Sequence, residues 1–257
     1  MNGTRGKAQD DWDRHWGAYS SMSARNPAQR YRQKLILDLL GLARAPGPVR
    51  VLDLGSGSGE LAGAVLRARP DAEVVGLDLA DAGIEIARQK VPRASFLHHD
   101  LTKPSAALSR YEGWATHAVC SEVLEHLDDP RAMLTSARGL LGHGASFVVT
   151  VPAGPVSAFD RHIGHRRHFS PALLEATLRD AGFDIVDLRG AGFPFFNLYR
   201  LAVVARGRAL IEDASEGNGE RLPRSARAAI RMFSLLFKMN MKSSRFGWQL
   251  AAVAVPR

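Results

Sequence analysis

The sequence predicts an α/β protein with a doubly wound, mostly parallel sheet of seven strands, and two observations support this prediction. Between residues 49 and 190, short apolar segments typical of strands alternate with segments of helical periodicity. Such alternation is typical of a parallel sheet covered by helices on both faces. The chain has 257 residues, of which 46% are apolar, and this is enough to bury the core of one large domain.

Each expected element has a local signal. The strand-like segments are 49–55, 73–79, 94–101, 116–123, 146–153, 183–190 and 248–256. The helix-like segments of the cap and core are 26–41, 60–70, 82–91, 130–141 and 171–181. The last helix is the best marked, because Ser170 suits the N-cap, Pro171 the first turn and Gly182 the position just past the end.

We expect one domain with four parts. They are an N-terminal helical cap (1–46), a core (49–190), a helical insertion between the sixth and seventh strands (191–246) and a terminal strand (247–257). The insertion should contain two amphipathic helical segments joined by the polar stretch 213–223, which reads as a linker. The cap should hold one helix, for which Asn26 is a suitable N-cap residue.

Composition excludes several classes of protein. A single cysteine, Cys120, excludes a disulfide framework and any multi-cysteine zinc site. The N-terminus has no apolar run typical of a signal peptide. Three arginines interrupt the apolar stretch 192–211, which makes it a poor transmembrane span. We therefore expect a soluble, cytoplasmic protein.

A glycine-rich loop directly follows the first strand. Gly55, Gly57 and Gly59 allow a ligand to approach the backbone closely, at the N-terminus of a helix. Asp53 precedes the loop, and Asp78 ends the second strand about 20 residues further on, where a ribose-binding acid is expected. Glu60 stands where a dinucleotide site has its third glycine. This substitution disfavours a nicotinamide oxidoreductase.

Four segments, in this order and spacing, resemble the class I S-adenosylmethionine-dependent methyltransferases. They are "VLDLGSGSG", "GLDLA", "FLHHDL" and "CSEVLEHLDDP". The resemblance covers roughly residues 49–190 and the terminal strand. It implies a Rossmann-like methyltransferase fold, with a reversed seventh strand inserted beside the fifth, and S-adenosyl-L-methionine as the cofactor.

The resemblance also implies a cofactor site that runs from the methionine end to the adenine. Asp53 and the glycine loop would hold the methionine end, and Asp78 would bind both ribose hydroxyls. The N-terminal cap would form a lid to which Tyr19 or Tyr31 belongs. The implied cofactor-binding residues are Asp53, Gly55, Ser56, Gly57, Asp78, Leu79, Asp100, Leu101, Ser121, Glu122 and Tyr19.

Two loops should flank the methyl acceptor, because ligands of an open α/β sheet lie outside the carboxyl ends of its strands. The first loop, after the fourth strand, carries Glu122, Glu125 and His126, and the second is "FDRHIGHRRHFS" at 159–170. An oxygen or carbon acceptor must lose a proton, and histidine is the natural base near neutral pH. The candidate catalytic residues are His126, His165, His162 and Glu122. The sequence supports almost equally the alternative that His126 is a structural residue of a helical turn.

The second loop offers two further interpretations. Arg161, Arg166 and Arg167 could clamp an acidic group on the acceptor, or pair with nearby acids and only fasten the loop. His162, His165 and His168 are spaced for one face of a helix, but Gly164 and Pro171 argue against a helix there. Asp160 is the only obvious carboxylate partner, and we expect no metal.

The C-terminal fifth of the chain is strongly basic. From residue 206 to 257 there are ten Lys and Arg and four acids, which is +6 of the formal charge of +8. On a helical wheel, one stripe holds the basic residues Arg224, Arg227, Arg231, Lys238 and Lys242. This segment reads either as a helical cap with a solvated basic face or as a lid that also touches an anionic membrane surface. A nucleic-acid partner is not favoured, because the charge is not spread over the fold.

These observations favour a methyltransferase that acts on a small or lipid-like acceptor, at oxygen with carbon or nitrogen as options, as in natural product biosynthesis. The acceptor would be hydrophobic or acidic. The candidate substrate-binding residues are His162, His165, Arg166, His168, Phe195, Phe196 and Tyr199. The alternatives are a protein of the same fold that binds the cofactor but catalyses a non-methylating reaction such as a cyclisation, and an RNA methyltransferase.

Overall fold

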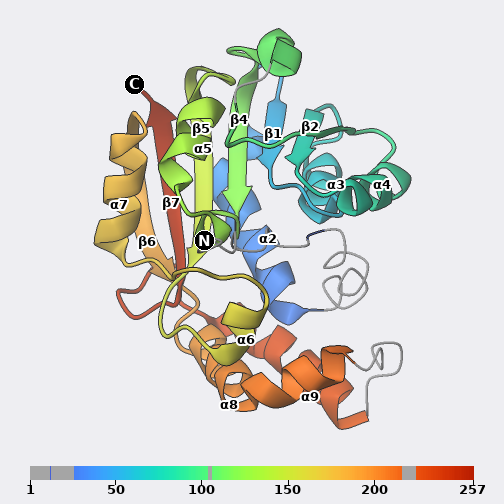
Figure 1. Ribbon diagram of the computed structural model, residues 1–257, viewed down its shortest axis with the longest axis vertical. Helices are drawn as coiled ribbons and strands as arrows, with labels where there is room; N and C mark the ends of the chain where they lie inside the picture. The colour runs from blue at the N-terminus through green and yellow to red at the C-terminus, as the bar shows by residue number, and fades with distance from the viewer. Residues whose placement is uncertain (1–11, 13–25, 104–105, 216–223) are drawn as a thin grey trace, which may run out of the picture.

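A computed structural model describes residues 12, 26–103, 106–215 and 224–257, and the side chains of 208–226 are not described. A seven-stranded sheet in the order β3-β2-β1-β4-β5-β7-β6 forms the centre of the molecule (Figure 1). Its strands are β1 (Arg50–Leu54), β2 (Glu73–Asp78), β3 (Ser95–His98), β4 (Ala115–Ser121), β5 (Leu141–Pro152), β6 (Phe183–Ala191) and β7 (Gln249–Pro256). Only β7 is antiparallel to its neighbours β5 and β6, and the predicted fold class is confirmed.

Helices cover both faces of the sheet. The helices are α2 (Pro27–Leu40), α3 (Glu60–Ala68), α4 (Asp81–Lys90), α5 (Pro130–Arg138), α6 (Ala158–His162), α7 (Pro171–Asp180), α8 (Phe195–Ser215) and α9 (Arg224–Leu236). Short 3-10 turns are η1 (Leu42–Arg44), η2 (Ala106–Tyr111), η3 (Leu124–His126) and η5 (Phe237–Met239). Buried residues of α2, α3 and α4 pack together on one face, and those of α5 and α7 pack on the other.

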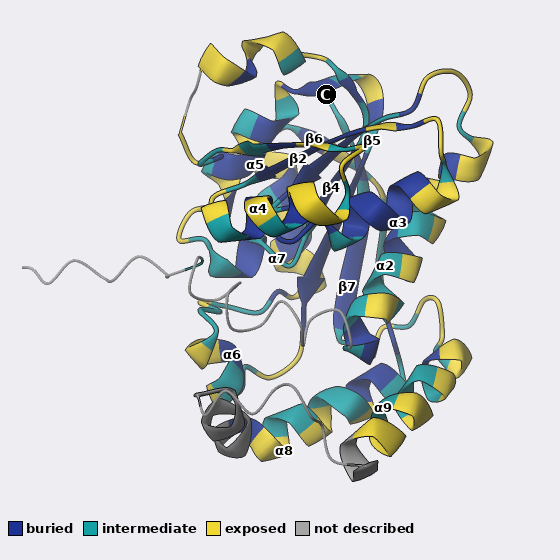
Figure 2. Ribbon diagram, turned by 90° about the vertical axis from the view of Figure 1, so that its right-hand side faces the viewer, coloured by how far each residue is buried: buried dark blue, intermediate teal, exposed yellow. Residues whose placement is uncertain are grey.

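The period of two along β1 explains why both faces are buried. Val51 joins the core under α2 and α3, whereas its neighbour Leu52 joins the core under α5 and α7. Successive side chains of a strand point to opposite faces, so a strand covered on both faces reads as a continuous apolar run. The dark blue strands in Figure 2 show this burial across the sheet.

The insertion between β6 and β7 lies beyond the carboxyl ends of β4 and β5 (Figure 1). Asn240 fixes the start of α8, because its side-chain oxygen accepts hydrogen bonds from the backbone N–H groups of Phe195 and Phe196. Asn197 of α8 in turn bonds the backbone at Phe246 and Trp248, just before β7. The insertion is thus attached to the sheet by the chain that enters its last strand.

One detail of the basic segment differs from the expectation. The helix α9 ends at Leu236 and passes into η5, so Lys242 lies beyond the helix and not on a continuous stripe. In this turn Phe237 packs beside Phe196, and Asn240 just after it bonds the start of α8. Arg227, Arg231 and Lys238 are exposed, as predicted for a basic face, and the side chain of Arg224 lies outside the described residues.

The N-terminal helix α2 begins where the sequence indicates. The Asn26 side chain accepts a hydrogen bond from the N–H of Ala28, and Gly41 ends the helix with a left-handed backbone. Tyr31 points into an aromatic cluster with Phe196 and Phe237. Burial raises the pKa of Tyr31 to about 12. The helix therefore joins the sheet to the insertion.

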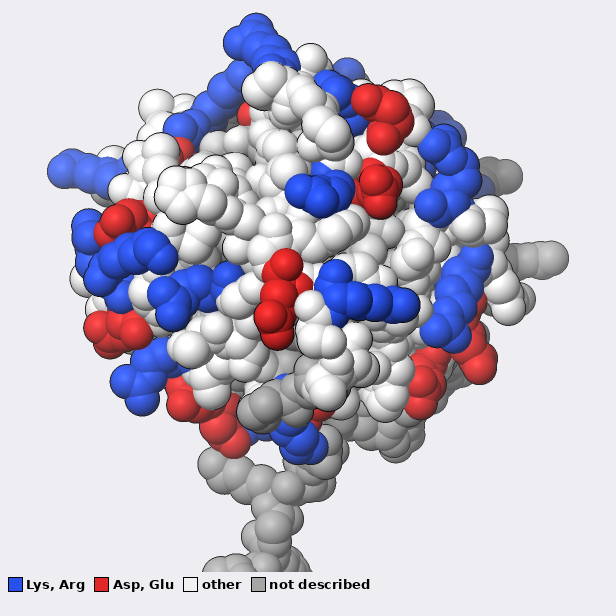
Figure 3. Space-filling view, turned by 90° about the horizontal axis from the view of Figure 1, so that it is seen from above, with Lys and Arg blue, Asp and Glu red and all other residues white. Residues whose placement is uncertain are grey.

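No helix among the described residues is long and apolar enough to cross a membrane. The end of the molecule opposite the insertion carries Lys, Arg, Asp and Glu side chains interspersed (Figure 3). This face presents no broad expanse of a single charge, in contrast to the basic face of α9.

Candidate active site

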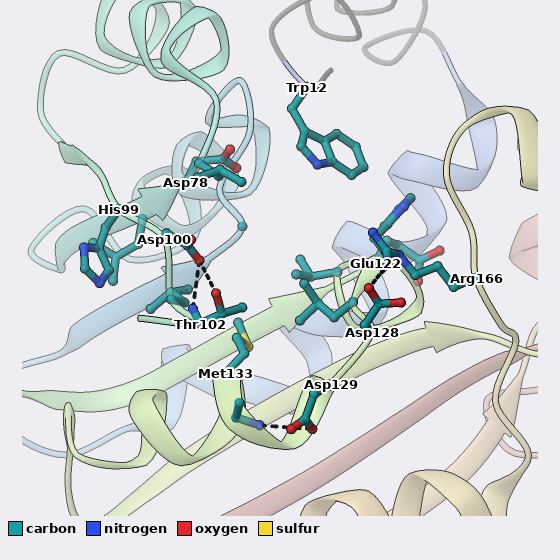
Figure 4. Close-up of a pocket in the computed structure, with 18 residues that line it drawn as sticks. Trp12, Asp78, His99, Asp100, Thr102, Glu122, Asp128, Asp129, Met133 and Arg166 are labelled. Carbon is teal, nitrogen blue, oxygen red and sulfur yellow. Dashed lines mark hydrogen bonds and ion pairs between the residues drawn. The ribbon is translucent and has the colours of Figure 1, made fainter. Parts of the chain in front are cut away.

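A cavity of about 420 Å³ opens at the carboxyl ends of the strands, where the sequence places the ligand site. Its wall comes from the loops after β1, β2, β3, β4 and β5, and from Trp12 of the N-terminal segment (Figure 4). The lining residues are Trp12, Gly55, Leu77, Asp78, Leu79, His99, Asp100, Leu101, Thr102, Glu122, Val123, His126, Leu127, Asp128, Asp129, Ala132, Met133 and Arg166. Residues of the two predicted sites, for cofactor and acceptor, thus share one cavity.

The glycine loop adopts the tight turn that its composition predicts. Gly55 has a φ of 78°, and a Cβ placed there would overlap a methyl group of Val123. The N–H of Gly57 donates a hydrogen bond of 2.7 Å to Asp78, and the N–H of Ala80 donates one of 2.9 Å to the other oxygen. Burial raises the pKa of Asp78, although these bonds oppose the shift. The Asp78 carboxyl is thereby fixed at the rim of the cavity.

Asp53 lies fully inside the protein beside the glycine loop. Among the described residues, its Oδ2 has no hydrogen-bond partner, and the same holds for the hydroxyls of Ser56 and Ser58. Burial raises the pKa of Asp53 to about 7, and the nearby Asp78 adds to the shift. Buried polar groups in proteins almost always have partners. These three orphaned groups next to a glycine turn fit the polar end of a bound cofactor.

The adenine side of the predicted site is formed by the turn after β3. Asp100 accepts hydrogen bonds from the backbone N–H and the hydroxyl of Thr102 and pairs with Lys103. Burial opposes ionisation of Asp100, but these bonds hold its pKa below the usual value. Leu101 is buried, whereas Leu79 is 37% exposed and available to a ligand. Figure 4 shows Asp78 and Asp100 on the same side of the cavity.

Glu122 occupies an unusual backbone conformation directly after β4. Its φ is 58°, the only positive value among described residues other than glycine. Such a conformation costs roughly 1–3 kcal/mol and persists only where the surroundings impose it. Here the Glu122 N–H donates to the carbonyl of Thr150, and its carboxylate binds Gln249 at 2.8 Å and Arg32 at 3.4 Å. The hydroxyl of Thr150 also donates to that of Ser121, which is not among the cavity-lining residues.

A row of imidazole rings leads away from the cavity. Trp12 contacts His126 edge to face at 4.6 Å between ring centres, and His126 contacts His165 in the same way at 4.7 Å. His165 Nδ1 lies 3.1 Å from His168 Nε2, and His168 Nδ1 lies 3.0 Å from the carbonyl oxygen of Gly154. Burial lowers the pKa of His165 to about 4 and also lowers that of His168. His126 lines the cavity, while His165 and His168 stand behind it.

Asp160 anchors the loop that carries these histidines. Its carboxylate completes a capping box with Ser157 and forms a two-pronged ion pair with Arg200 of α8 at 2.9–3.1 Å. Burial opposes ionisation of Asp160, but the bonds and charge of Arg200, together with Ser157, lower its pKa to about 2. The pair fastens the loop after β5 to the insertion.

The arginines of this loop fasten it to the loop after β4. Arg167 donates hydrogen bonds to the carbonyls of Leu127 and Asp128. Arg166 lines the cavity and pairs with the Asp128 carboxylate. Of the two uses expected for these side chains, pairing within the protein is therefore observed for both. His162, at the exposed end of α6, is not among the cavity-lining residues.

The aromatic residues predicted to bind substrate form a cluster of their own. Phe196 and Tyr199 pack with Tyr31, Phe233 and Phe237 between α2, α8 and α9. Neither they nor Phe195 lines the cavity described above. A second cavity of about 650 Å³ lies near the start of α8, and its lining includes His168, Phe193 and Trp248. Tyr19 lies outside the described residues.

Two groups of side chains in the described part of the chain lie close enough to bind a metal ion. They are Glu125, His126 and His165, and Asp160, His165 and His168. In each group the donor atoms lie within 4.8 Å of one another. The trio of His162, His165 and His168, which the sequence already disfavours as a metal site, is not one of these groups, and His162 is exposed at the end of the short helix α6. Sequence reasoning missed that Glu125 lies beside the histidines of the other loop.

Several site residues come from segments that sequence reasoning did not connect with the cavity. Arg32, Arg200 and Gln249 hold Glu122 and Asp160, and Trp12 forms part of the wall. The sequence contains one usable signal, the spacing Ser157-x-x-Asp160 of a capping box before α6. The other partners depend on strand register and helix packing, which the sequence alone does not reveal.

Three features of the structure define a class of enzymes that bind a nucleotide cofactor, and class I methyltransferases belong to it. They are a parallel sheet with a reversed strand beside β5, a glycine turn, and an acid at the end of β2. The sequence matches the methyltransferase domain family over residues 27–188, so the chain belongs to this family. It is an S-adenosylmethionine-dependent methyltransferase.

One relative and two solved structures each share less than a third of their aligned residues with this chain. The chain is 28% identical over 213 residues to a ubiquinone biosynthesis O-methyltransferase of Hahella chejuensis, covering 76% of this chain and 87% of the relative. Among solved structures, phosphoethanolamine N-methyltransferase 2 of Haemonchus contortus has a TM-score of 0.64 at 17% identity, covering 99% of this chain and 62% of that one. The (4+2)-cyclase SpnF has a TM-score of 0.62 at 18% identity, covering 95% and 94%. The two structures support the fold alone.

Proposed function

We propose that this methyltransferase transfers the methyl group of S-adenosyl-L-methionine to a hydroxyl oxygen of a small or lipid-like acceptor, as in secondary metabolism. The proposal rests on the cavity of about 420 Å³ at the carboxyl ends of the strands. Asp78 and Asp100 lie on one side of it, Glu122 and Arg166 lie on the other, and His126 is also among the lining residues. Relatives named as O-methyltransferases of ubiquinone biosynthesis favour oxygen as the acceptor atom and a lipid-like acceptor.

The residues on the cofactor side have chemically suitable positions. Asp78 is preset to accept hydrogen bonds from ribose hydroxyls, because the N–H groups of Gly57 and Ala80 already orient its carboxylate. Asp53 is not among the residues that line the cavity, but its buried Oδ2 has no hydrogen-bond partner among the described residues and is suited to the cationic methionine end. When bound, the cofactor supplies a methyl group on a sulfonium, whose leaving group is good. Much of the rate then depends on alignment by the protein.

The acceptor side must promote loss of the hydroxyl proton. His126 lines the cavity and contacts His165, so we assign this task to the two histidines. Glu122 is bound by Arg32 and Gln249, and we assign it a positioning role. Arg166, which also lines the cavity, gives an acidic group on the acceptor a cationic partner. His162 lies outside the cavity wall and has no part in the proposal.

Calorimetry with S-adenosylhomocysteine and a methyl-transfer assay on extract fractions test the proposal together. We expect binding by the wild type, and a radiolabelled methyl group on a small apolar product. His126→Ala should keep cofactor binding and lose transfer. Failure of the wild type to bind S-adenosylhomocysteine would contradict the proposal. Cofactor binding with no transfer to any fraction, but with another conversion of a substrate, would instead favour a non-methylating enzyme of this fold.

We also propose that α9 contacts an anionic membrane surface and so brings the enzyme to a lipid-like acceptor. Arg227 and Arg231 of α9 and Lys238 of η5 are exposed, and five apolar side chains of α9 and of the chain up to residue 246 are exposed as well. These are Met232 (51%), Leu235 (63%), Met239 (68%), Met241 (52%) and Phe246 (54%). Exposed cationic and apolar side chains together are typical of helices that lie in a membrane interface.

Sedimentation with anionic vesicles at low salt tests this contact. The wild type should sediment with phosphatidylglycerol vesicles, and Arg227→Glu/Arg231→Glu should sediment less. Vesicles of neutral phosphatidylcholine serve as the control for charge. Equal sedimentation of wild type and variant, or none at all, would contradict membrane contact.

A further inference from the structure

The Glu125 carboxyl is buried in the described protein without a hydrogen-bond partner. Its residue is 0% exposed, and neither carboxylate oxygen has a hydrogen-bond partner among the described residues. A buried ionised carboxylate without a partner is very unfavourable, and such groups are normally paired or bound to a metal. Glu122 lies close enough to repel it further. Arg32 is the nearby cation that acts on Glu125, but its guanidinium pairs with Glu122 and forms no hydrogen bond with the Glu125 carboxyl.

Two histidines from separate loops complete a donor set around this carboxyl. The carboxylate oxygen of Glu125 and one ring nitrogen each of His126 and His165 lie within 4.8 Å of one another. Donor atoms around a tetrahedral Zn²⁺ lie about 3.3 Å apart, given metal–ligand distances of about 2.0–2.1 Å. Adjustment of the side chains by about an ångström therefore brings all three atoms to one ion.

The two loops are held in register by their backbones. The N–H of Arg166 donates a hydrogen bond of 2.9 Å to the carbonyl of Glu125, and the Arg167 side chain bonds the carbonyls of Leu127 and Asp128. His165 directly precedes Arg166, so it arrives beside Glu125 on a fixed backbone. The donor set is thus organised without help from the ion.

The hydrogen bonds on the Nδ1 side of His165 determine that its other ring nitrogen, Nε2, carries a lone pair and no proton. A carbonyl oxygen can only accept, so the contact of His168 Nδ1 with the Gly154 carbonyl assigns the proton to that nitrogen. His168 Nε2 then accepts from His165 Nδ1–H. His165 Nε2 is left unprotonated. A histidine whose other nitrogen donates to a fixed partner is the usual arrangement at metal sites.

From this geometry we infer that Glu125, His126 and His165 bind a first-row divalent transition-metal ion such as Mn²⁺ or Zn²⁺. One carboxylate and two imidazoles, without a thiolate, suit such ions better than Ca²⁺, which prefers six or more oxygen ligands. The other group is less suitable, because Arg200 and Ser157 already bind the Asp160 carboxylate. Both nitrogens of His168 also have partners.

The ion also deepens the proposed function, and this part of the inference rests on it. Three protein ligands leave coordination positions open, and His126 places them at the wall of the cavity. A hydroxyl oxygen of the acceptor bound there would lose its proton to solvent more readily, because the cation stabilises the alkoxide or phenolate. The ion would thus take the place of a general base, and His126 and His165 would promote loss of the hydroxyl proton as ligands of the ion and not by accepting the proton themselves. Acceptors with two adjacent oxygens are the class best suited to such a site.

The binding test uses full-length protein without a tag, first freed of metal with a chelator. Calorimetry with MnCl₂ and with ZnCl₂ should give one saturable site in the wild type. Glu125→Gln, which keeps the shape of the side chain, should weaken binding by about 100-fold or more, as should His165→Gln. The matched control is His162→Ala on the same loop, which should bind within about twofold of wild type. Circular dichroism confirms folding of each variant.

Two outcomes would overturn the inference. One is the absence of a saturable site in the wild type, and the other is unchanged binding in both folded ligand variants. Calorimetry with S-adenosylhomocysteine on the same samples separates this inference from the proposed function. Cofactor binding without metal binding would reject the metal site alone. Metal binding without cofactor binding would reject the proposed function and leave the metal site standing.

Discussion

The polar groups on the two sides of the cavity are held by partners at very different distances along the chain. On the cofactor side, Asp100 bonds to Thr102, two residues away, in the turn that it forms itself. On the acceptor side, Glu122 bonds to Arg32 of α2 and to Gln249 of β7. The cofactor side is thus stabilised by its own turns and by the neighbouring glycine loop, whose Gly57 bonds Asp78, whereas the acceptor side depends on the packing of remote elements.

This difference has a consequence for substitutions. A change on the cofactor side should lower cofactor affinity and leave the fold largely intact. A change on the acceptor side should also lower stability, because the same bonds join α2, β7 and the insertion to the sheet. The predictions below test this contrast, beginning with the largest expected effect.

Arg200→Ala should cost about 3–5 kcal/mol of stability, because it leaves the Asp160 carboxylate buried without its cationic partner. Thermal or denaturant unfolding measures the loss. Arg179→Ala is the matched control, since it removes an exposed ion pair with Glu175 on α7 and should cost about 0.5 kcal/mol or less. Equal losses of stability in the two variants would show that the Arg200–Asp160 pair contributes no more than an exposed ion pair.

Asp53→Asn should flatten the dependence of stability on pH. The pKa of Asp53 in the folded protein is about 7, above its ordinary 3.8, so between these values the folded form keeps a proton that the unfolded form releases. Wild-type stability should therefore fall by roughly 2–4 kcal/mol as pH rises from about 4 to 7. Unfolding curves of both proteins at pH 5 and pH 8 measure the difference. If the stabilities of the two proteins changed equally with pH, ionisation of Asp53 would not destabilise the folded protein, and the prediction would be wrong.

Asp78→Ala should lower the affinity for S-adenosylhomocysteine by about 100-fold, or ~2.7 kcal/mol, because the ribose loses a charged acceptor. Calorimetry measures this change. Asp81→Ala, three residues further on at the exposed start of α4, should bind within about twofold of wild type. Stability of Asp78→Ala should change little by comparison with Arg200→Ala. A collapse of the fold would show that the cofactor side is not local after all.

Gly55→Ala should lower the free energy of unfolding by about 2 kcal/mol. It tests the contact between the glycine loop on the cofactor side and the loop on the acceptor side. The new methyl group would enter Val123 of the acceptor loop, and the φ of 78° adds backbone strain. Gly113→Ala is the control for strain alone, because its φ is 61° and no atom lies within 4 Å of the added Cβ. Val123→Ala should rescue part of the loss in Gly55→Ala. No rescue would mean that the backbone alone sets the cost.

The same contrast explains what the sequence could and could not predict. The strands and the positions of Asp53 and Asp78 follow from apolar runs, glycines and short-range spacing, whereas the place of the reversed last strand follows from the family resemblance, and the structure confirms the fold. The burial of Glu125 between two loops depends on the register that joins Arg166 to the loop after β4. The location of Phe196 and Tyr199 in a cluster with α2 depends on how the insertion folds back. Neither depends on a local pattern.

The reversed direction of β7 has a practical consequence for work with this enzyme. Because the strand runs opposite to β5, its first residue, Gln249, arrives at the cavity end of the sheet and bonds Glu122, while its last residues lie at the other end. Arg257 there pairs with Asp184, far from the insertion (Figure 1). A label attached to the C-terminus would therefore leave ligand binding undisturbed, whereas a truncation before Gln249 would remove a strand and release the Glu122 side chain together.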